Sequence, residues 1–217
     1  MTKKVALLVL FTTAFVLALA CDDTSGPCGC PPVVRPVLKD LSQRNHVLDN
    51  IEAAYNYRRI DWYNGLLDQD FTFFLSTGDV NGGLPASWNR AEEVDINTKL
   101  FDTSYTALPA QNIFLDIRSE DGVSWMEFHP QSAPSETWYS TTLHYDYRFE
   151  ISPNTYIPAP GAQAVFTVRD AGVYGKYAHH WQLVEFSDLG GSAAVKASAS
   201  AARTEPSTLG AVKAMYR

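Results

Sequence analysis

The chain has 217 residues, of which 46% are hydrophobic and 12% aromatic, and its formal net charge is -7 at pH 7. This composition can fill the core of one domain of about 150 residues with flanking segments. An acidic chain without a basic patch does not follow a phosphate backbone, so the composition argues against nucleic acid as a partner.

The N-terminus has the layout of a secretory signal peptide. Lys3 and Lys4 precede an apolar run over 5–20, which ends in small residues before Cys21. The run is shorter than the ~20 residues of a membrane-spanning helix. The cysteine resembles the acylation site of bacterial lipoproteins. We therefore predict a lipoprotein signal peptide over 1–20, although an ordinary signal peptide or an uncleaved membrane anchor stays open.

Cys21 is the predicted lipidation site, carrying palmitate or a similar acyl chain, and it places the protein in the bacterial cell envelope. There it is lipid-anchored to a membrane and, in a Gram-negative host, faces the periplasm. Two or more acyl chains give stable anchoring, where one gives only marginal binding. Asp22 follows the cysteine, a residue type that marks inner-membrane lipoproteins in enteric bacteria. The choice between inner and outer membrane stays open.

Residues 21–37 are rich in Pro, Gly and acidic residues, which predicts a flexible tether. Cys28 and Cys30 lie within it and, in an oxidising compartment, could pair with each other or with a partner. A Cys-x-Cys pair alone does not indicate zinc, because a closed zinc site needs four ligands. We therefore predict no metal in the tether.

Two helices are predicted after the tether. Apolar residues recurring on one side predict a long amphipathic helix over 38–57. Its apolar stripe consists of Leu38, Leu41, Leu48, Ile51 and Tyr55. A shorter helix is predicted over 59–68, with Ile60, Tyr63 and Leu67 on its buried side and Gly65 weakening it.

Aromatic content predicts a short strand over 71–75. The Gly-rich segment 76–85 matches neither the P-loop nor the dinucleotide-binding pattern, so we predict a plain loop. Ser87 is then the candidate N-cap of a third helix over 88–102. The predicted inner face of that helix consists of Trp88, Ala91, Val94 and either Leu100 or Phe101.

The remaining part of the domain is predicted to form β-strands. Strands are predicted over 111–118, 122–128, 137–151, 162–170 and 175–187. The strand over 137–151 alternates cleanly between two faces. One face carries Leu143, Tyr145, Tyr147, Phe149 and Ile151, and the other carries His144, Asp146, Arg148 and Glu150. Residues 190–217 form a low-complexity tail that ends in a possible short helix packing back on the domain.

Helices followed by an antiparallel sheet predict the α+β class, with helices laid against one sheet face. Over 38–189 the pattern resembles the NTF2-like (SnoaL-like) superfamily. The residues that carry the resemblance are Leu48-x-x-Ile51-x-x-Ala54-Tyr55, Phe71-x-Phe73, Trp88-x-x-x-Glu92, Trp181-x-Leu183 and Phe186-x-Asp188. The resemblance implies a cone, in which three N-terminal helices close a curved, mainly antiparallel sheet. It also implies a cavity for a small apolar molecule and a homodimer through the sheet face.

Some relatives are enzymes, so we looked for their catalytic residues. In the steroid-isomerase type the base position falls near Leu75 or Ser76, where no carboxylate stands, although Tyr55 is in place as an oxyanion donor. The epoxide-hydrolase type needs an Asp-Arg-Asp network, for which Asp146 and Arg148 are the best pair. Because the neighbouring aromatic residues are the natural cavity liners, the pattern favours a solvated outer face for this pair.

His144, His179 and His180 are the remaining candidates for acid–base or metal chemistry. Adjacent histidines on a strand point to opposite faces, so only one of His179 and His180 can enter a cavity. A metal site would need three converging ligands. We predict no metal and no cofactor.

The predicted function is that of a lipid-anchored, non-catalytic binding protein for a small apolar ligand or a protein partner. The predicted lining residues are Tyr55, Tyr63, Phe73, Trp88, Tyr145, Tyr147 and Trp181. The alternative is an isomerase- or hydrolase-type enzyme that uses Asp146, Arg148 and one of His144 or His179. A scaffold that dimerises through its sheet is a third reading. The direction of Asp146 and Arg148 discriminates between them.

Overall fold

The computed structural model describes residues 37–107, 110–118, 122–152, 155–172, 175–191 and 208–217. Val37–Arg217 forms one compact unit. The predicted signal peptide, the tether up to Pro36 and its three cysteines lie outside the described residues. Within the described ranges no helix is long and apolar enough to cross a membrane.

The first two helices are shorter than the sequence predicts. Helix α1 spans Arg44–Asn56 and helix α2 spans Ile60–Leu66. The segment before α1 is not helical because its backbone forms hydrogen bonds with a side chain of α1. The Asn50 side chain accepts a hydrogen bond from the Lys39 backbone N–H at 2.9 Å and donates to the Lys39 carbonyl at 2.8 Å. These bonds tie the entering chain to α1.

The Gly-rich segment contains a short helix, α3 (Thr77–Asn81), so the predicted plain loop was wrong. Ser76 is its N-cap, because its hydroxyl accepts a hydrogen bond from the Asp79 backbone N–H. Ser87, the predicted cap of the next helix, lies instead in strand β2 (Ser87–Asn89) and pairs with Phe74.

Helix α4 spans Arg90–Phe101, and Asn89 and Glu92 form a complete capping box at its start. The inner face predicted for this helix was correct for Leu100 and Phe101, and Trp88 is buried in β2, but Ala91 and Val94 were wrong. Ala91 is exposed and Val94 is half-buried. The buried residues of α4 are Glu93, Ile96, Asn97, Leu100 and Phe101. Two polar side chains therefore face the core, for reasons given below.

In the described part of the chain, seven strands form one sheet. They are β1 (Leu67–Phe74), β2, β3 (Asn112–Arg118), β4 (Met126–Phe128), β5 (Trp138–Ser152), β6 (Thr155–Asp170) and β7 (Trp181–Gly191). The order is β2-β1-β7-β6-β5-β3, with β4 also pairing with β5. Among these described strands, β1 and β7 pair in parallel and the other pairs are antiparallel. The predicted strands over 122–128 and 175–187 start too early, and β6 begins before its predicted start at 162.

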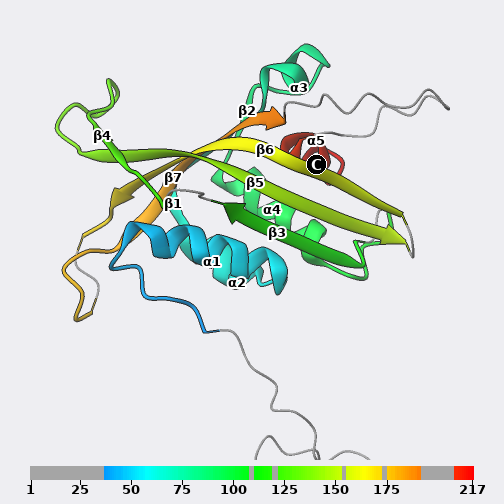
Figure 1. Ribbon diagram of the computed structural model, residues 1–217, viewed down its shortest axis with the longest axis horizontal. Coiled ribbons are helices and arrows are strands. Elements are labelled where there is room, and N and C mark those ends of the chain that lie inside the picture. The colour runs from blue at the N-terminus through cyan, green and yellow to red at the C-terminus, as the bar shows by residue number, and fades with distance from the viewer. Residues whose placement is uncertain (1–36, 108–109, 119–121, 153–154, 173–174, 192–207) are drawn as a thin grey trace, which may run out of the picture. The chain divides into compact units, whose positions relative to one another are not determined.

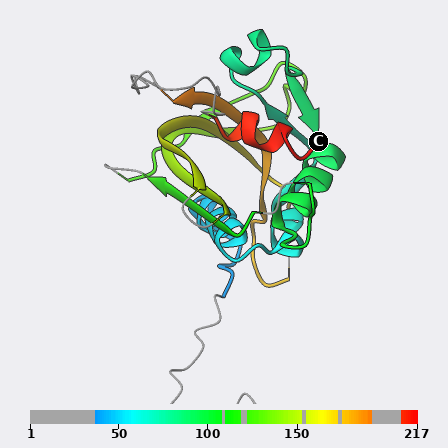
Figure 2. The same ribbon diagram turned by 90° about the vertical axis from the view of Figure 1, so that its right-hand side faces the viewer.

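The long strands β5 and β6 bend over the helices, as Figures 1 and 2 show. Their register shifts between Tyr145 and Tyr147. There Gly161 has a φ of 67°, and its N–H donates to the Asp146 side chain at 2.6 Å. An irregularity of this kind increases the bend of a strand. The predicted α+β class, with helices packed on a curved and mainly antiparallel sheet, is confirmed.

The C-terminal residues form helix α5 (Leu209–Ala214), with Thr208 as its N-cap. Figure 2 shows α5 inside the bend of the sheet, beside α4. Leu209, Val212 and Tyr216 are buried. The terminal helix thus occupies the space that the helices and the sheet enclose.

Candidate functional site

The alternation of β5 determines which of its side chains reach the interior. Leu143, Tyr145, Tyr147 and Phe149 are all buried. The side chains between them are exposed or half-exposed. The two faces predicted for this strand are therefore confirmed over 143–150, and the side chain of Ile151 lies outside the described part of the structure.

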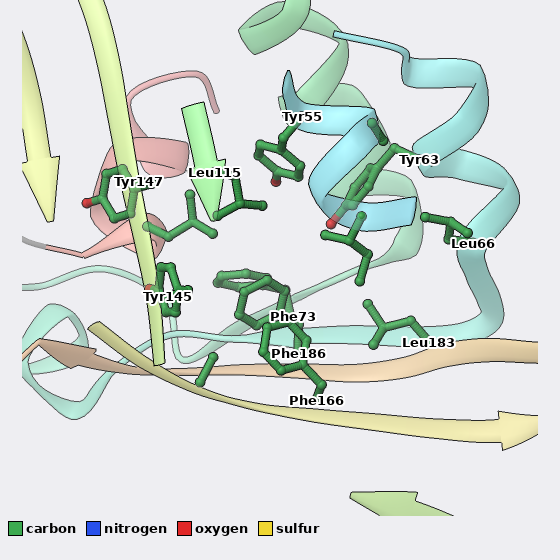
Figure 3. Packing of buried hydrophobic residues seen from close by; sticks show 14 of the residues in the cluster. Tyr55, Tyr63, Leu66, Phe73, Leu115, Tyr145, Tyr147, Phe166, Leu183 and Phe186 are labelled. Atoms are coloured by element: carbon green, nitrogen blue, oxygen red, sulfur yellow. The ribbon is translucent and has the colours of Figure 1, made fainter. Parts of the chain in front are cut away.

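Aromatic rings from the helices and the sheet meet in the interior (Figure 3). The rings of Tyr55 and Tyr63 lie edge-to-face with centroids 5.3 Å apart. Phe73 stacks on Trp88 at 4.8 Å and contacts Phe186 at 4.9 Å. Edge-to-face and offset stacking are the preferred arrangements of aromatic pairs.

A carboxylate lies at the centre of these rings. Glu93 Oε1 accepts hydrogen bonds from the Tyr63 hydroxyl at 2.5 Å and from Asn97 Nδ2 at 2.9 Å, and Oε2 accepts one from Trp88 Nε1 at 2.6 Å. The Tyr55 hydroxyl donates to Asn97 Oδ1 at 2.7 Å, which orients that amide. The donors come from different elements, so the scaffold itself holds this carboxylate.

The fourth donor to Glu93 is the ammonium group of Lys213 on α5. Its Nζ lies 2.6 Å from Glu93 Oε1, and both side chains are 0% exposed. A buried charge needs a partner and hydrogen bonds to be tolerated. The pair explains why two polar residues, Glu93 and Lys213, lie on the inner faces of α4 and α5.

Burial shifts the ionisation of this cluster. It lowers the pKa of the Lys213 ammonium, while the Glu93 carboxylate opposes that shift. It raises the pKa of the Tyr55 and Tyr63 hydroxyls far above the usual range. Both tyrosines are therefore neutral hydrogen-bond donors at neutral pH. Since Glu93 already accepts four hydrogen bonds, this arrangement suits holding a cation better than accepting a proton from a substrate.

A second pair of carboxylates holds the start of α5. Asp188 accepts hydrogen bonds from the Gly210 backbone N–H at 2.8 Å and from the Tyr145 hydroxyl at 2.9 Å. Asp79 accepts one from the Thr208 hydroxyl at 2.7 Å. A Cβ atom added to Gly210 would lie 3.3 Å from Leu75 Cγ and 3.4 Å from an oxygen of each carboxylate, so these neighbours would have to shift slightly to admit a side chain. Burial raises the pKa of Asp188.

The Tyr147 hydroxyl lies in the same part of the interior. It is buried and has no hydrogen-bond partner among the described residues. Burial, with the charges of Asp188 and Asp79, raises the pKa of this hydroxyl. A neutral donor is thus available in the interior beside the acidic pair.

Trp181 differs from the other predicted lining residues in its ring contacts. It is buried, and its ring contacts Tyr139 at 5.3 Å and His179 at 5.7 Å. The guanidinium of Arg44 lies 5.3 Å from the Trp181 ring and 4.1 Å from that of Tyr139. All seven predicted residues belong to one buried core. Six of them lie around or beside Glu93 and Asp188, and the ring contacts of Trp181 are instead with Tyr139 and His179.

The residues predicted for the alternative enzyme lie on the outer face. Asp146 forms an ion pair with Arg118 at 2.9 Å, and Arg118 also pairs with Asp116 at 2.6 Å. Asp146 and Asp116 lie directly opposite each other on β5 and β3. Arg148 is exposed, with its guanidinium 5.8 Å from the Phe114 ring. Asp146 and Arg148 do not point into the interior, so the outer face favoured by the sequence is confirmed.

The three candidate histidines form no acid–base group with Asp146 and Arg148 in the described structure. His144 is exposed and contacts Gln163 on β6. His179 and His180 lie in the β6–β7 connection, where His179 Nδ1 is 2.5 Å from Asp170. Within the described ranges, no three His, Cys, Asp or Glu side chains come together in a group that could hold a metal ion.

A pocket of about 270 Å³ opens where the entering chain meets α1, α2 and the β6–β7 connection. Its apolar lining consists of Leu38, Leu41, Trp62, Leu66 and Tyr177, and its polar lining includes Asp61 and His180. A smaller pocket of about 170 Å³ lies between α1 and β3 and contains Glu52. None of the predicted lining residues borders either pocket.

Sequence reasoning missed Glu93, Asn97, Asp188 and Lys213. One signal was available for α4, because Glu93, Ile96, Asn97 and Leu100 recur at helical spacing and share one face. Two polar residues among apolar ones on that face indicate a buried polar site. Lys213 likewise follows Val212 in an apolar segment. Nothing in the sequence shows that Glu93 and Lys213 are partners.

Comparison with known proteins gives likeness of structure only. No family model matches the chain, and no curated protein matches it. Solved structures similar to it include an NTF2-like protein of unknown function from Pseudomonas putida (8% identity, 69% of this chain and 85% of that chain, TM-score 0.46). Two others are ActVI-ORFA from Streptomyces coelicolor (12%, 65% and 89%, 0.42) and an NTF2-like protein of unknown function in nutrient uptake from Rhodospirillum rubrum (10%, 67% and 95%, 0.42).

Proposed function

We propose that this protein is a lipid-anchored component of the bacterial cell envelope whose NTF2-like domain binds a small, largely apolar molecule without catalysis. The ligand occupies the interior of the curved sheet and is lined by the six gathered aromatic residues. The observation that carries the proposal is that the interior is closed by α5, a helix of 6 residues, while the rings and Glu93 are held by the rest of the domain.

Two further features support an interior site. The Tyr147 hydroxyl is a buried donor without a hydrogen-bond partner in the described structure, and a ligand would satisfy it. The start of α5 is held by polar contacts to Asp79 and Asp188 and by the buried side chain of Leu209. Hydrogen bonds to charged groups contribute about 1.5–3 kcal/mol each, and Leu209, Val212 and Tyr216 are buried as well, so a ligand has to supply comparable contacts to displace the helix.

Binding of the neutral apolar dye Nile red to the purified protein tests this site. Thr208→Ala removes the N-cap of α5, which costs about 1 kcal/mol and corresponds to a rise of roughly fivefold in the displaced state. We expect the dye to bind more tightly to this variant by a similar factor. Trp62→Ala, which alters the pocket beside α2, is the matched control and is expected to leave the affinity unchanged.

The opposite pattern would contradict the proposal. Loss of dye binding in Trp62→Ala, with no effect of Thr208→Ala, would move the site to the pocket beside α2. Absence of dye binding in all three proteins would remove the apolar binding function.

Membrane attachment through Cys21 is tested separately. Cells that express the full chain are labelled with radiolabelled palmitate, beside cells that express Cys21→Ser. We expect label in the wild-type protein and none in the variant. Equal label in both would contradict the lipid anchor.

A further inference from the structure

Lys213 presents its ammonium group to the interior much as a bound ligand would. The Nζ atom lies 4.1 Å from the Phe73 ring centroid, 5.3 Å from Phe186, 5.6 Å from Tyr55 and 5.8 Å from Tyr63. A cation within ~6 Å of a ring centroid is attracted by the negative face of that ring. Four rings and one carboxylate thus surround this nitrogen.

This cage does not depend on α5. Phe73 lies on β1, Phe186 on β7, Tyr55 on α1 and Tyr63 on α2. Glu93 is oriented by Tyr63, Trp88 and Asn97, none of which belongs to the terminal helix. Apart from Lys213, the cage and the hydrogen bonds that orient the carboxylate are therefore built without any residue of α5.

Departure of α5 would leave Glu93 buried without a countercharge. An unpaired charge in an apolar interior costs several kcal/mol, and removing one partner of a buried pair is strongly destabilising. The empty interior therefore favours a ligand that carries a positive charge over a neutral ligand of the same size.

We propose that the interior is a binding site for a small organic ammonium compound with a short apolar chain, and that Lys213 occupies this site until such a ligand displaces α5. The inference rests on the proposed function and specifies the chemical class of its ligand. The ammonium group pairs with Glu93 inside the ring cage, and the apolar chain contacts the aromatic lining.

Hydrogen exchange of the α5 backbone amides in the wild-type protein tests whether a ligand can take the place of Lys213 and α5. The probes are n-hexylammonium chloride and 1-hexanol, which differ only in the head group, at equal concentration and with sodium chloride added to the alcohol sample. With n-hexylammonium at about ten times its dissociation constant for the state in which α5 is displaced, we expect the amides of residues 210–216 to exchange roughly tenfold faster. We expect no comparable effect of 1-hexanol.

The other outcomes separate the two proposals. Equal acceleration by both probes, or acceleration by the alcohol alone, would overturn the preference for a cation and leave the apolar binding function standing. No acceleration by either probe would overturn both, because α5 would then be a permanent part of the core.

A second experiment tests the cage directly. Lys213→Ala removes three carbon atoms and the nitrogen, which together have the shape of n-propylamine. We expect n-propylammonium, and not 1-propanol, to raise the midpoint of urea unfolding of this variant. Lys213→Met, whose side chain fills the space, is the matched control and is expected to show no such shift. Equal shifts with both compounds, or in both variants, would overturn the proposal.

Discussion

At the scale of single residues, the interior is organised by one buried ion pair. Glu93 accepts four hydrogen bonds, and the one from Lys213 brings the compensating charge. Breaking such a pair by removing one partner costs more than replacing both partners, because a charge is then left without compensation. The stability of the domain therefore depends on this pair as a unit.

Lys213→Met is expected to lower the free energy of unfolding by about 3–5 kcal/mol, the usual cost of a broken buried pair. Adding Glu93→Gln removes the stranded charge, so the double variant is expected to be more stable than Lys213→Met alone. Urea unfolding of the wild type, the two single variants and the double variant measures both effects. Additive losses in the double variant would show that the two residues do not act as a pair.

Asp188 gives a prediction for pH dependence. Burial raises its pKa in the folded protein above the ordinary 3.8, so the folded state holds this proton more tightly than the unfolded state. The resulting stability is fully present below pH 3.8 and is lost as the pH rises through the folded-state pKa.

Asp188→Asn cannot titrate and lacks this contribution. We expect the difference in unfolding free energy, wild type minus Asp188→Asn, to fall as the pH rises from below 3.8 towards neutrality. Urea unfolding over that range measures it. A difference that stays constant or grows with pH would contradict the assigned direction.

At the scale of elements, the start of α4 shows how a cap is chosen by its surroundings. Ser87 and Asn89 are both good N-cap residue types, but Ser87 belongs to the β1–β2 ladder. Asn89 is the residue whose side chain accepts hydrogen bonds from Ala91 and Glu92. The helix in turn carries Glu93 and Asn97, so its start sets the phase of the whole site.

Asn89→Ala is expected to destabilise the protein by about 1 kcal/mol, since it removes the capping box. Ser87→Ala removes a hydroxyl that caps nothing, and its effect is expected to stay within about 0.5 kcal/mol. Thermal or urea unfolding distinguishes them. A larger loss for Ser87→Ala would mean that the helix begins earlier.

At the scale of the whole folded unit, the curved sheet separates two kinds of chemistry. Its inner face carries aromatic rings and paired buried charges, while its outer face carries exposed ion pairs such as Arg118 with Asp116 and Asp146. Exposed pairs contribute little to stability, about 0–1 kcal/mol each. Function is therefore expected to follow changes inside the sheet.

Asp146→Asn and Arg148→Gln serve to check this separation. Each is expected to change the unfolding free energy by no more than about 1 kcal/mol and to leave Nile red affinity at the wild-type value. Dye titration and urea unfolding of the two variants provide the test. A large loss of binding in either variant would bring the outer face back as part of the site.

Local patterns in the chain were enough to identify the α+β class, the two faces of β5 and the buried residues Leu48, Ile51 and Tyr55 of α1, although Leu38 and Leu41 of the predicted stripe lie before that helix. Each of these predictions depends on apolar residues that recur every 2 residues in a strand or every 3.6 residues in a helix. Such a pattern can be read from a short stretch of sequence. The prediction that nucleic acid is not a partner and the prediction of a signal peptide likewise depend only on the sequence, through its acidic composition and its basic, apolar N-terminus.

The site itself depended on contacts between distant parts of the chain. Glu93 and Lys213 are 120 positions apart, and only the folded sheet brings them within 2.6 Å. A buried charge is tolerated because of its partner, and no local pattern records where that partner stands. The same reason explains why the sequence predicted an aromatic cavity, whereas the tertiary structure placed the chain's own terminal helix and its lysine inside it.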